Sequence, residues 1–519
     1  MAWHDVPVIE IVLGRSGLHI RRNKNLVPLG SFKTLRNATL EDDSVRTAAG
    51  ATPLGDAIGA LTIQTAIDYW PTTAVQRTIV GLSDGSIRKD DGSGASWSSL
   101  ASGLTTTGTV PFFALGGREL VGKNAKVFYC DRVNAVRVLS ADAASMTTIG
   151  NPPADWNGTN QPGFLVAHDR WLFGAGNAND PKRIYRSAGD DHENFLLESW
   201  SQHIAGQYEY LAAGLSYKGG LLLFGYPEGV WFLSTESDND RQWRPLRVGV
   251  AGASGPANVM AIEDDVLWIA PDGSLHLISA TNATGSARAE DIAYEQLGEF
   301  LAENINLTQL ATAQFVYYAH KRVAMLACHA LGATTKNRRI ELDVARVKDL
   351  GGRYTYHDRH RNEALFLRKT SGILTPHFGD ASGQLWTMDR AARSDNGAGY
   401  TFEWQISDDD LARVIEDWAG KKKNGRFLQL EYDPRATAEH TIDVFRDGSL
   451  KQEITFALSA GPTALPVTLP VTLSEAILRT TRKRRLLGQA TRWSFGGVST
   501  VAGEDISLTK ILVGLEAAE

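Results

Sequence analysis

Pairs of apolar segments joined by tight turns recur along this chain, and they constrain its fold more than any other feature. Residues 263–279, EDDVLWIAPDGSLHLIS, place two short apolar runs on either side of a Pro-Asp-Gly turn. The Asp272-Gly273 step supplies the positive φ values that a tight hairpin needs. Six related segments bring the number of predicted hairpins to seven: 75–91, 117–131, 168–187, 217–234, 320–344 and 372–389.

The spacing of these hairpins predicts a repeat architecture. Their turns recur at intervals of roughly 40 to 60 residues, and several follow a further apolar segment, such as 163–168, 208–214 and 258–263. Units of three or four strands at this spacing are typical of a β-propeller. A series of β-sandwiches shows similar strand spacing and is the alternative. We predict an all-β fold in which residues 61–400 form a divergent β-propeller of about six to seven blades.

The two ends of the chain differ from the repeats. Residues 1–60 contain Pro and Gly with little alternation, which predicts an extended N-terminal arm. Such an arm can close the ring by pairing with the last blade, or it can reach a neighbouring subunit. In residues 401–519, the stretch 406–425 predicts one short helix capped by Ser407 or Asp408, and alternating strands follow it. We expect a C-terminal antiparallel β-rich companion domain there.

Composition places the chain among folded proteins and limits its partners. Apolar residues make up 43% of the 519 residues and charged residues 22%, which is typical of packed domains. A net charge of -6 does not suit a protein that grips nucleic acid over its whole surface. Cys130 and Cys328 are too few for a disulfide framework, so we expect two buried thiols made in a reducing compartment. We also expect no membrane span and no secretion signal.

The sequence contains no recognisable catalytic set. Residues 81–85, GLSDG, match the GxSxG pattern, but they fall in the predicted hairpin 75–91 and so give no strand-to-helix elbow. The Walker, HExxH and dinucleotide-binding glycine patterns are absent. The acidic cluster of Glu263, Asp264 and Asp265 has the residue types for acid-base chemistry, but a solvated turn before a strand is the favoured interpretation. We expect no enzyme, no cofactor and no catalytic or metal-binding residue.

Two further patterns have both a chemical and a structural interpretation. His357 and His360 stand three residues apart, a spacing that on a helix can present two metal ligands. No third ligand follows at a recognisable spacing, so a solvated polar loop between blades is favoured. Residues 89–97, KDDGSGASW, resemble the Asp-box turn of sialidase-like propellers, with Asp91 one place early. That turn stabilises a fold and performs no catalysis.

The densest charge in the chain is basic and lies within residues 401–519. The run 479–485, RTTRKRR, and three lysines after the expected helix can contact phosphate or an acidic partner surface. A solvated edge that blocks strand-to-strand aggregation is the alternative. The candidate residues are Arg479, Arg482, Lys483, Arg484, Arg485, Lys421, Lys422 and Lys423.

The order of segments along the chain resembles that of tail-hub, or tail-nozzle, proteins of short-tailed bacteriophages. Residues 25–55 resemble the opening of that family, with a Pro/Gly turn, an asparagine-bearing strand and a short charged turn. Residues 168–195 are similar to its strand, asparagine-rich turn and Tyr-Arg-Ser strand. Residues 215–233 and 248–278 look like the succeeding blades, and residues 484–517 resemble the last strands of its companion domain.

This resemblance implies a structural protein of the virion tail that is synthesised in the bacterial host cytoplasm. The family forms a homo-hexameric ring below the portal and adaptor, continues the DNA channel, and helps to retain the packaged genome until ejection. The implied partners are the portal and adaptor, tail fibre or tail needle proteins, and double-stranded DNA in transient, non-sequence-specific passage. A mildly acidic chain suits a channel along which DNA must slide.

Two other functions stay open at this point. A propeller glycan hydrolase is suggested by the aromatic content and by the Asp-box-like turn. The second is a receptor-binding module at the tail tip, which this sequence does not distinguish from a tail hub.

Overall fold

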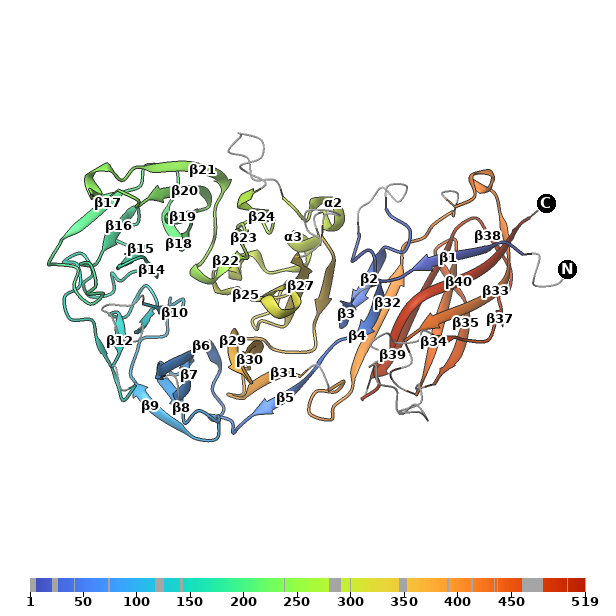
Figure 1. Cartoon of the computed structure of the whole chain (residues 1–519), viewed down its shortest axis with the longest axis horizontal. Helices are drawn as coiled ribbons and strands as arrows, with labels where there is room; N and C mark the ends of the chain where they lie inside the picture. The colour runs from blue at the N-terminus through green and yellow to red at the C-terminus, as the bar shows by residue number, and fades with distance from the viewer. Residues whose placement is uncertain are drawn as a thin grey trace, which may run out of the picture.

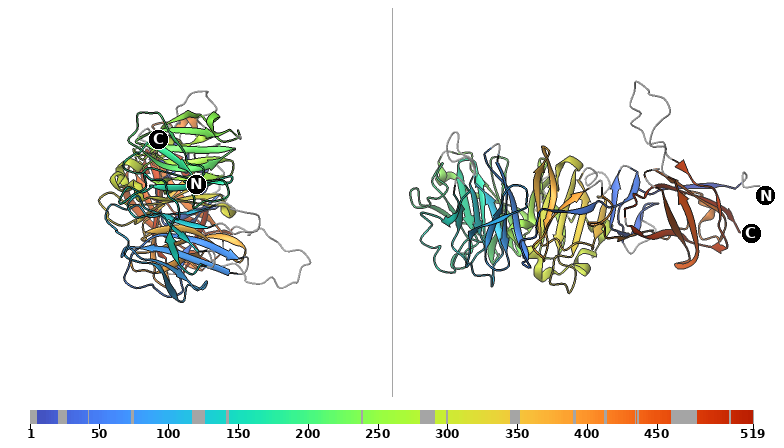
Figure 2. Two further views of the ribbon diagram at one scale, coloured as in Figure 1. Left: turned by 90° about the vertical axis from the view of Figure 1, so that its left-hand side faces the viewer. Right: turned by 90° about the horizontal axis from the view of Figure 1, so that it is seen from below.

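The computed structural model shows a β-propeller joined to a second β-rich domain (Figure 1). The two parts follow one another along the long axis of the molecule (Figure 2). The predicted all-β propeller fold is therefore confirmed. The structure describes residues 6–20, 27–41, 43–72, 75–116, 126–140, 143–237, 239–279, 291–298, 300–344, 352–389, 392–411, 414–433, 435, 437–459, 479–501 and 503–518.

Four blades follow one another in chain order, and each is a four-stranded antiparallel sheet in which sequential strands pair. The first two contain β6 (Ile63–Thr72), β7 (Val75–Leu82), β8 (Ile87–Asp90) and β9 (Trp97–Ala101), then β10 (Phe112–Leu115), β11 (Val127–Cys130), β12 (Arg137–Leu139) and β13 (Met146–Thr148). The next two contain β14 (Phe164–His168), β15 (Trp171–Ala175), β16 (Arg183–Arg186) and β17 (Trp200–His203), then β18 (Tyr210–Tyr217), β19 (Gly220–Tyr226), β20 (Glu228–Ser234) and β21 (Pro245–Ala251). The turn expected within 117–131 falls at residues 117–125, which lie outside the described residues.

Three more sheets complete the ring. They contain β22 (Val259–Ile262), β23 (Asp265–Ile269) and β24 (Leu275–Leu277), then β25 (Gln314–Tyr318), β26 (Val323–Cys328), β27 (Arg338–Asp343) and β28 (Tyr354–His357), and finally β29 (Ala364–Thr370), β30 (Ile373–Gly379), β31 (Leu385–Asp389) and β5 (Gly50–Leu54). The described residues thus form six four-stranded blades and one smaller three-stranded sheet. This agrees with the predicted six to seven blades.

The N-terminal segment closes the ring. The inner strands contact one another around the axis in the order β6, β10, β14, β18, β22, β25 and β29, and β29 lies against β6. The outer strand of the last blade is β5, which pairs antiparallel with β31 so that Thr52 stands opposite Thr387. Of the two roles considered for this segment, the structure shows pairing with the last blade.

Short Asp-x-Ser turns join the second and third strands in three of the sheets. In each turn the aspartate Oδ1 accepts hydrogen bonds from the backbone N–H and the hydroxyl of the serine two positions later, which is an Asx turn. The pairs are Asp84–Ser86, Asp272–Ser274 and Asp380–Ser382. Asp91 accepts from Ser93 in the same way in the Asp-box-like segment. The Asp-x-Ser turn is therefore a sequence feature that several blades share, and a comparison of the apolar segments alone does not reveal it.

The companion domain takes strands from both ends of the chain. Its eight-stranded sheet contains β1 (Val8–Val12), β3 (Ala38–Glu41), β4 (Ser44–Thr47), β33 (Lys423–Tyr432), β36 (Arg479–Thr480), β37 (Arg484–Arg485), β38 (Gln489–Ala490) and β40 (Ser507–Ala517). Its second layer contains β2 (Phe32–Arg36), β32 (Tyr400–Ile406), β34 (Ala438–Arg446), β35 (Ser449–Leu458) and β39 (Trp493–Val501). The described part of residues 1–60, expected to be an extended arm, therefore contains five strands, β1 to β5, and each of them pairs within a sheet of the propeller or of the companion domain.

One sheet crosses from the propeller into the companion domain. Its nine strands run in the order β25-β26-β27-β28-β2-β32-β39-β34-β35. Strand β2 pairs antiparallel with β32, and at Arg36 it pairs in parallel with Tyr356 of β28. Backbone hydrogen bonds therefore connect the two parts of the molecule, in addition to the chain segments that pass between them.

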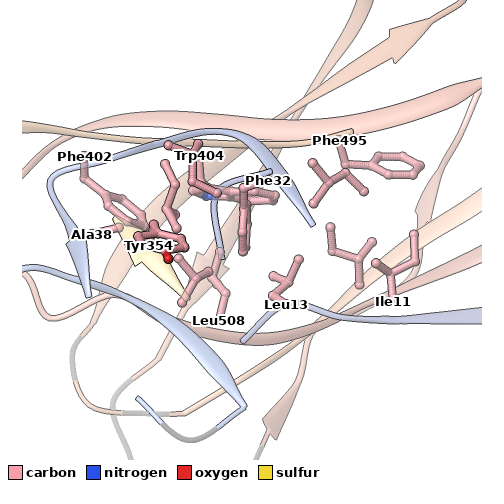
Figure 3. Packing of buried hydrophobic residues seen from close by; sticks show 14 of the residues in the cluster. Ile11, Leu13, Phe32, Ala38, Tyr354, Phe402, Trp404, Phe495 and Leu508 are labelled. Atoms are coloured by element: carbon pink, nitrogen blue, oxygen red, sulfur yellow. The ribbon is translucent and has the colours of Figure 1, made fainter. Parts of the chain in front are cut away.

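The largest hydrophobic core lies where the N-terminal strands meet the C-terminal strands (Figure 3). Phe32 is fully buried, and its ring meets the Trp404 ring edge-on at 6.4 Å between centroids. Ile11 and Leu13 pack in the same cluster as Phe495 and Leu508, which lie almost 500 residues later in the chain. Smaller buried clusters fill the spaces between adjacent blades.

The helices whose bounds the structure describes are short turns. They are α2 (Tyr294–Leu297), α3 (Phe300–Asn304), η3 (Asp240–Gln242), η4 (Pro256–Asn258), η5 (Leu307–Thr312), η6 (Ala319–Lys321) and η8 (Glu416–Trp418). Among its described residues, the segment 406–425 contains one short helical turn, η8, but the cap predicted at Ser407 or Asp408 is wrong because the turn begins at Glu416. Asp409 forms a β-bridge with Trp493, and the buried Leu411 has a φ of 58°, which interrupts a right-handed helix.

The first prediction concerns the core between the two ends of the chain. Replacing Phe32 with alanine removes a fully buried ring, so we expect the free energy of unfolding to fall by about 3–5 kcal/mol. Urea denaturation followed by tryptophan fluorescence measures this change. Leu197 is 72% exposed, and Leu197→Ala is the control, with an expected effect within about 0.5 kcal/mol. A similarly small effect of Phe32→Ala would contradict the described packing.

The second prediction concerns a buried histidine in the companion domain. Trp404 donates its indole N–H to His440 Nε2 at 3.1 Å, and Ser499 Oγ lies 2.8 Å from His440 Nδ1. Burial lowers the pKa of His440 to about 4, from an ordinary value of 6.5. Between these two values the unfolded state binds the proton more readily than the folded state, so stability is full above pH 6.5 and falls as the pH drops toward 4.

We expect the His440→Gln variant to lose less stability over this pH window than the unmodified protein. Urea denaturation at a series of pH values compares the slopes. The exposed His320 provides the control, because His320→Gln should keep the original slope. Parallel curves for His440→Gln and the unmodified protein would show that His440 is not held neutral.

Candidate functional site

The basic run forms one edge of the companion domain. Strands β36 and β37 pair with β33, on the side opposite β40. Arg482, Arg484 and Arg485 are exposed there, and their guanidinium groups make no ion pair with a carboxylate of the described residues. The half-buried Lys483 places its ammonium 4.1 Å from the centre of the Phe427 ring. The edge therefore presents arginine side chains that can contact an acidic surface or a phosphate.

The three candidate lysines lie at the start of β33, and they differ from one another. Lys421 and Lys422 are exposed, so their ammonium groups stay available for contact with phosphate or an acidic surface. Lys423 is fully buried, and its Nζ donates to the backbone oxygen of Thr491 at 2.9 Å. Burial also lowers the pKa of Lys423. The assignment of Lys423 as an interface or phosphate contact is wrong, because its ammonium is enclosed by the domain.

A cavity of about 600 Å³ lies where the propeller meets the companion domain. We call it the junction cavity. Its walls come from the end of β2, the β28–β29 loop, the β30–β31 turn and the segment before β32. The wall side chains include Arg36, Arg359, Arg361, Trp386 and Tyr400. Four segments distant in sequence thus supply guanidinium groups and aromatic rings to one space.

Three aspartates line the junction cavity, and the protein itself satisfies each of them. Asp380 accepts four hydrogen bonds, among them one from the Trp386 indole N–H at 2.9 Å. Asp358 accepts from Asn37 at 3.1 Å and lies 2.7 Å from the Arg36 Nε. Asp395 accepts from a backbone N–H at 3.1 Å, and the Arg359 guanidinium and the His360 imidazole lie within 3.4 Å of it. These carboxylates hold the walls in place.

The histidines of the β28–β29 region are buried, so the interpretation of a solvated polar loop is wrong. His357 is 1% exposed and lies 3.3 Å from Glu341. His360 Nε2 lies 2.9 Å from Asp395, and Arg359 lies 3.4 Å from the same carboxylate. Burial lowers the pKa of His357, and it lowers the pKa of His360 to about 4. Backbone pairing of β28 with β27 draws this segment inside.

A smaller pocket of about 270 Å³, which we call the central pocket, lies at the mouth of the propeller, beside the first residues of several inner strands. Lys336 is 4% exposed, and its Nζ donates to the backbone oxygen of Glu363. Burial lowers the pKa of Lys336 to about 8 and that of His329 to about 4, and it raises the pKa of Glu363. Threonine and glutamine side chains form much of the remaining wall. The pocket is polar, with a lysine that loses its charge at mildly alkaline pH.

The acidic cluster before β23 does not form a carboxylate pair. The exposed Glu263 accepts from Arg322 at 2.7 Å. Asp265 is 4% exposed and accepts from the backbone N–H of Ser279 at 3.0 Å. The interpretation of a solvated turn holds for Glu263 and is wrong for Asp265, which stabilises its hairpin.

The remaining sequence predictions concern the two cysteines, metal binding and membrane-spanning helices. Cys130 and Cys328 are free and buried, as expected. Among the described residues, no group of three or more His, Cys, Asp or Glu side chains is arranged to hold a metal ion. No helix in the described part of the chain is long and apolar enough to cross a membrane.

Sequence reasoning missed the junction cavity. The RHR segment containing Arg359 and Arg361 was visible as a charged stretch, but its partners lie near residues 36, 386 and 395. Adjacency of those segments arises from sheet pairing across more than 300 residues. The Asp-x-Ser turn at 380–382 was the local signal that could have placed one wall.

Comparison with known proteins finds similarity of structure only. No model of a known protein family matches the chain, and no curated protein matches it. A structure of PorZ, a surface component of the type-IX secretion system of Porphyromonas gingivalis, matches with a TM-score of 0.36 and 12% identity, over 64% of this chain and 37% of PorZ. YCF48 from Cyanidioschyzon merolae matches with a TM-score of 0.38 and 8% identity, over 66% of this chain and 99% of that chain. BamB from Moraxella catarrhalis matches with a TM-score of 0.38 and 11% identity, over 66% of this chain and 97% of BamB. At these scores the matches carry no argument about function.

The third prediction separates the buried lysine from its exposed neighbour. Lys423→Ala leaves the Thr491 oxygen without its donor, so we expect the free energy of unfolding to fall by about 1–3 kcal/mol. Lys422→Ala is the matched control, and we expect a change within about 0.5 kcal/mol. Urea denaturation measures both variants. Equal effects would contradict the burial of Lys423.

Proposed function

We propose that this chain is a structural subunit of the tail of a short-tailed bacteriophage, in the hub or nozzle ring below the portal and adaptor. In this role six copies form a ring that extends the DNA channel and helps to retain the packaged genome until ejection. The collinear resemblance of five segments to that family motivates the proposal. Neither catalysis nor a bound cofactor is part of it.

The observation that carries the proposal is the nine-stranded sheet shared by the propeller and the companion domain. A closed ring of identical subunits needs two different surfaces held in a fixed mutual orientation. Backbone pairing of β2 with both β28 and β32 supplies that rigidity. A flexible linker between two domains would not hold those two surfaces in register.

The basic edge is a suitable docking surface for such an assembly. Arg482, Arg484 and Arg485 are exposed on one side of the companion domain, whereas the chain as a whole is acidic. Opposite charge on adjoining surfaces favours correct pairing over wrong pairing. We propose that this edge meets an acidic surface of a neighbouring subunit or of a portal or adaptor protein.

The central pocket favours the structural role over glycan hydrolysis. Most glycoside hydrolases use a pair of carboxyl groups that flank the bond to be cleaved. Among the described residues that line the central pocket, Glu363 is the single acidic side chain. Its partner there is Lys336 rather than a second carboxylate.

The fourth prediction is that this protein is a stoichiometric part of virions. Quantitative mass spectrometry of gradient-purified particles should give about six copies of this protein for every twelve copies of the portal protein. These are the counts that the resemblance implies for rings with closed cyclic symmetry. Absence from purified particles would overturn the proposal.

The same particles made with the double variant Arg484→Glu/Arg485→Glu test the docking edge. We expect incorporation of this variant to fall by about tenfold or more, and the exposed propeller variant Arg241→Glu to incorporate normally. Equal incorporation of the two variants would show that the basic edge is not an assembly contact.

A further inference from the structure

The junction cavity has the size of a small-molecule site and is open to solvent on one side. Its volume of about 600 Å³ falls within the range of roughly 300–1,000 Å³ that such sites occupy. The walls belong to the propeller, the N-terminal segment and the segment that leads into β32, so the cavity exists only in the assembled fold. Nothing in the proposed tail function requires it.

The free hydrogen-bonding capacity of the cavity lies with donors. Hydrogen bonds and ion pairs within the protein already occupy Asp358, Asp380 and Asp395. By contrast, the Arg359 Nε is buried without a hydrogen-bond partner. Arg361 lines the cavity and is exposed, and its guanidinium makes no ion pair with a described carboxylate. Buried donors without partners are costly, and an acceptor-rich ligand would satisfy them.

The Arg359 guanidinium is held by its surroundings. The Arg359 side chain is 5% exposed and lies 4.0 Å from the centre of the Tyr400 ring. It also donates to the backbone oxygen of Ala49 and lies 3.4 Å from Asp395. Because these contacts already fix its position, little conformational entropy is lost when it meets an anion. Guanidinium groups pair with carboxylate and phosphate oxygens in a planar fork.

An aromatic wall accompanies these donors. Trp386 is half-buried and lines the cavity. Its N–H is held by Asp380 at 2.9 Å, and its ring lies nearly parallel to Phe378, at an interplanar angle of 10°. A fixed indole ring offers apolar surface for packing. Ser382 and Thr401 add hydroxyl groups to the same walls.

We propose that the junction cavity binds an anionic sugar. The carboxylate or phosphate of the sugar pairs with Arg361 and Arg359, and the C–H face of its ring packs on Trp386. The remaining hydroxyl groups of the sugar exchange hydrogen bonds with the polar walls. This proposal rests on the cavity alone and stands or falls separately from the role in a phage tail.

Isothermal titration of the full-length protein tests the proposal with four probes: glucuronate, glucose 6-phosphate, glucose and inorganic phosphate. We expect either or both anionic sugars to bind at least about tenfold more tightly than glucose and than inorganic phosphate, where tenfold corresponds to about 1.4 kcal/mol. The relative affinity of glucuronate and glucose 6-phosphate tells whether carboxylate or phosphate is preferred.

Variants locate the site. Arg361 is exposed, so Arg361→Ala is expected to fold and to weaken binding of the anionic sugar by about tenfold or more, with partial recovery in Arg361→Lys. Arg482→Ala, on the distant basic edge, is the matched control and should bind as the unmodified protein does. Trp386→Phe keeps an aromatic ring and should retain most of the affinity, whereas Trp386→Leu should reduce the preference for sugar over inorganic phosphate.

Several results would overturn this assignment. If glucose bound as tightly as the anionic sugars, Arg359 and Arg361 would not recognise the anionic group. Equal binding of inorganic phosphate would remove the role of Trp386 and indicate an adventitious ion only. Sugar binding that Arg361→Ala leaves unchanged would place the ligand elsewhere, and a lack of binding by all four probes at millimolar concentration would show that the cavity is not a sugar site.

Discussion

Backbone pairing by the N-terminal segment is the constraint on which the rest of the structure depends. Strand β5 supplies the outer strand of the last blade, and β2 lies between the β28 edge of a blade and β32 of the companion domain. An unpaired strand edge leaves backbone N–H and C=O groups unsatisfied and open to wrong pairing. The same short segment therefore closes the ring and joins the two domains.

Ion pairs fix the same region further. Arg46 pairs with Asp505 across more than 450 residues, and Arg353 pairs with Asp343 while donating to the backbone oxygen of Gly14 at 2.7 Å. Removing one partner of a buried pair leaves an uncompensated charge, whereas the intact pair adds little net stability. Such pairs are best understood as fixing the register between chain ends.

The two proposals use different parts of the molecule. The tail role depends on a rigid subunit and on an exposed basic edge, and the cavity depends on the walls that the same rigid junction creates. A ring subunit has no need of a sugar site, and a sugar-binding propeller has no need of a ring. The two sets of experiments therefore give independent answers, although both use the orientation that β2 imposes.

Sequence alone determined the hairpins, because each one is specified by neighbouring residues. Alternating apolar strands and an Asp-Gly or Asp-x-Ser turn contain the information for segments such as 75–91, 263–279 and 372–389.

Tertiary structure decided where residues 1–60 pair, since their partners lie more than 300 residues away and no local pattern encodes that choice. It also decided where the short helix expected within 406–425 begins, because bridging of Asp409 to Trp493 and burial of Leu411 leave only the turn Glu416–Trp418 helical among the described residues of that segment. In the same way it buried Lys423 and His360, which sequence places among solvated charges, because neighbouring strands fold over them. Tertiary structure alone decided the junction cavity, since its walls meet only after the sheet has crossed between the domains.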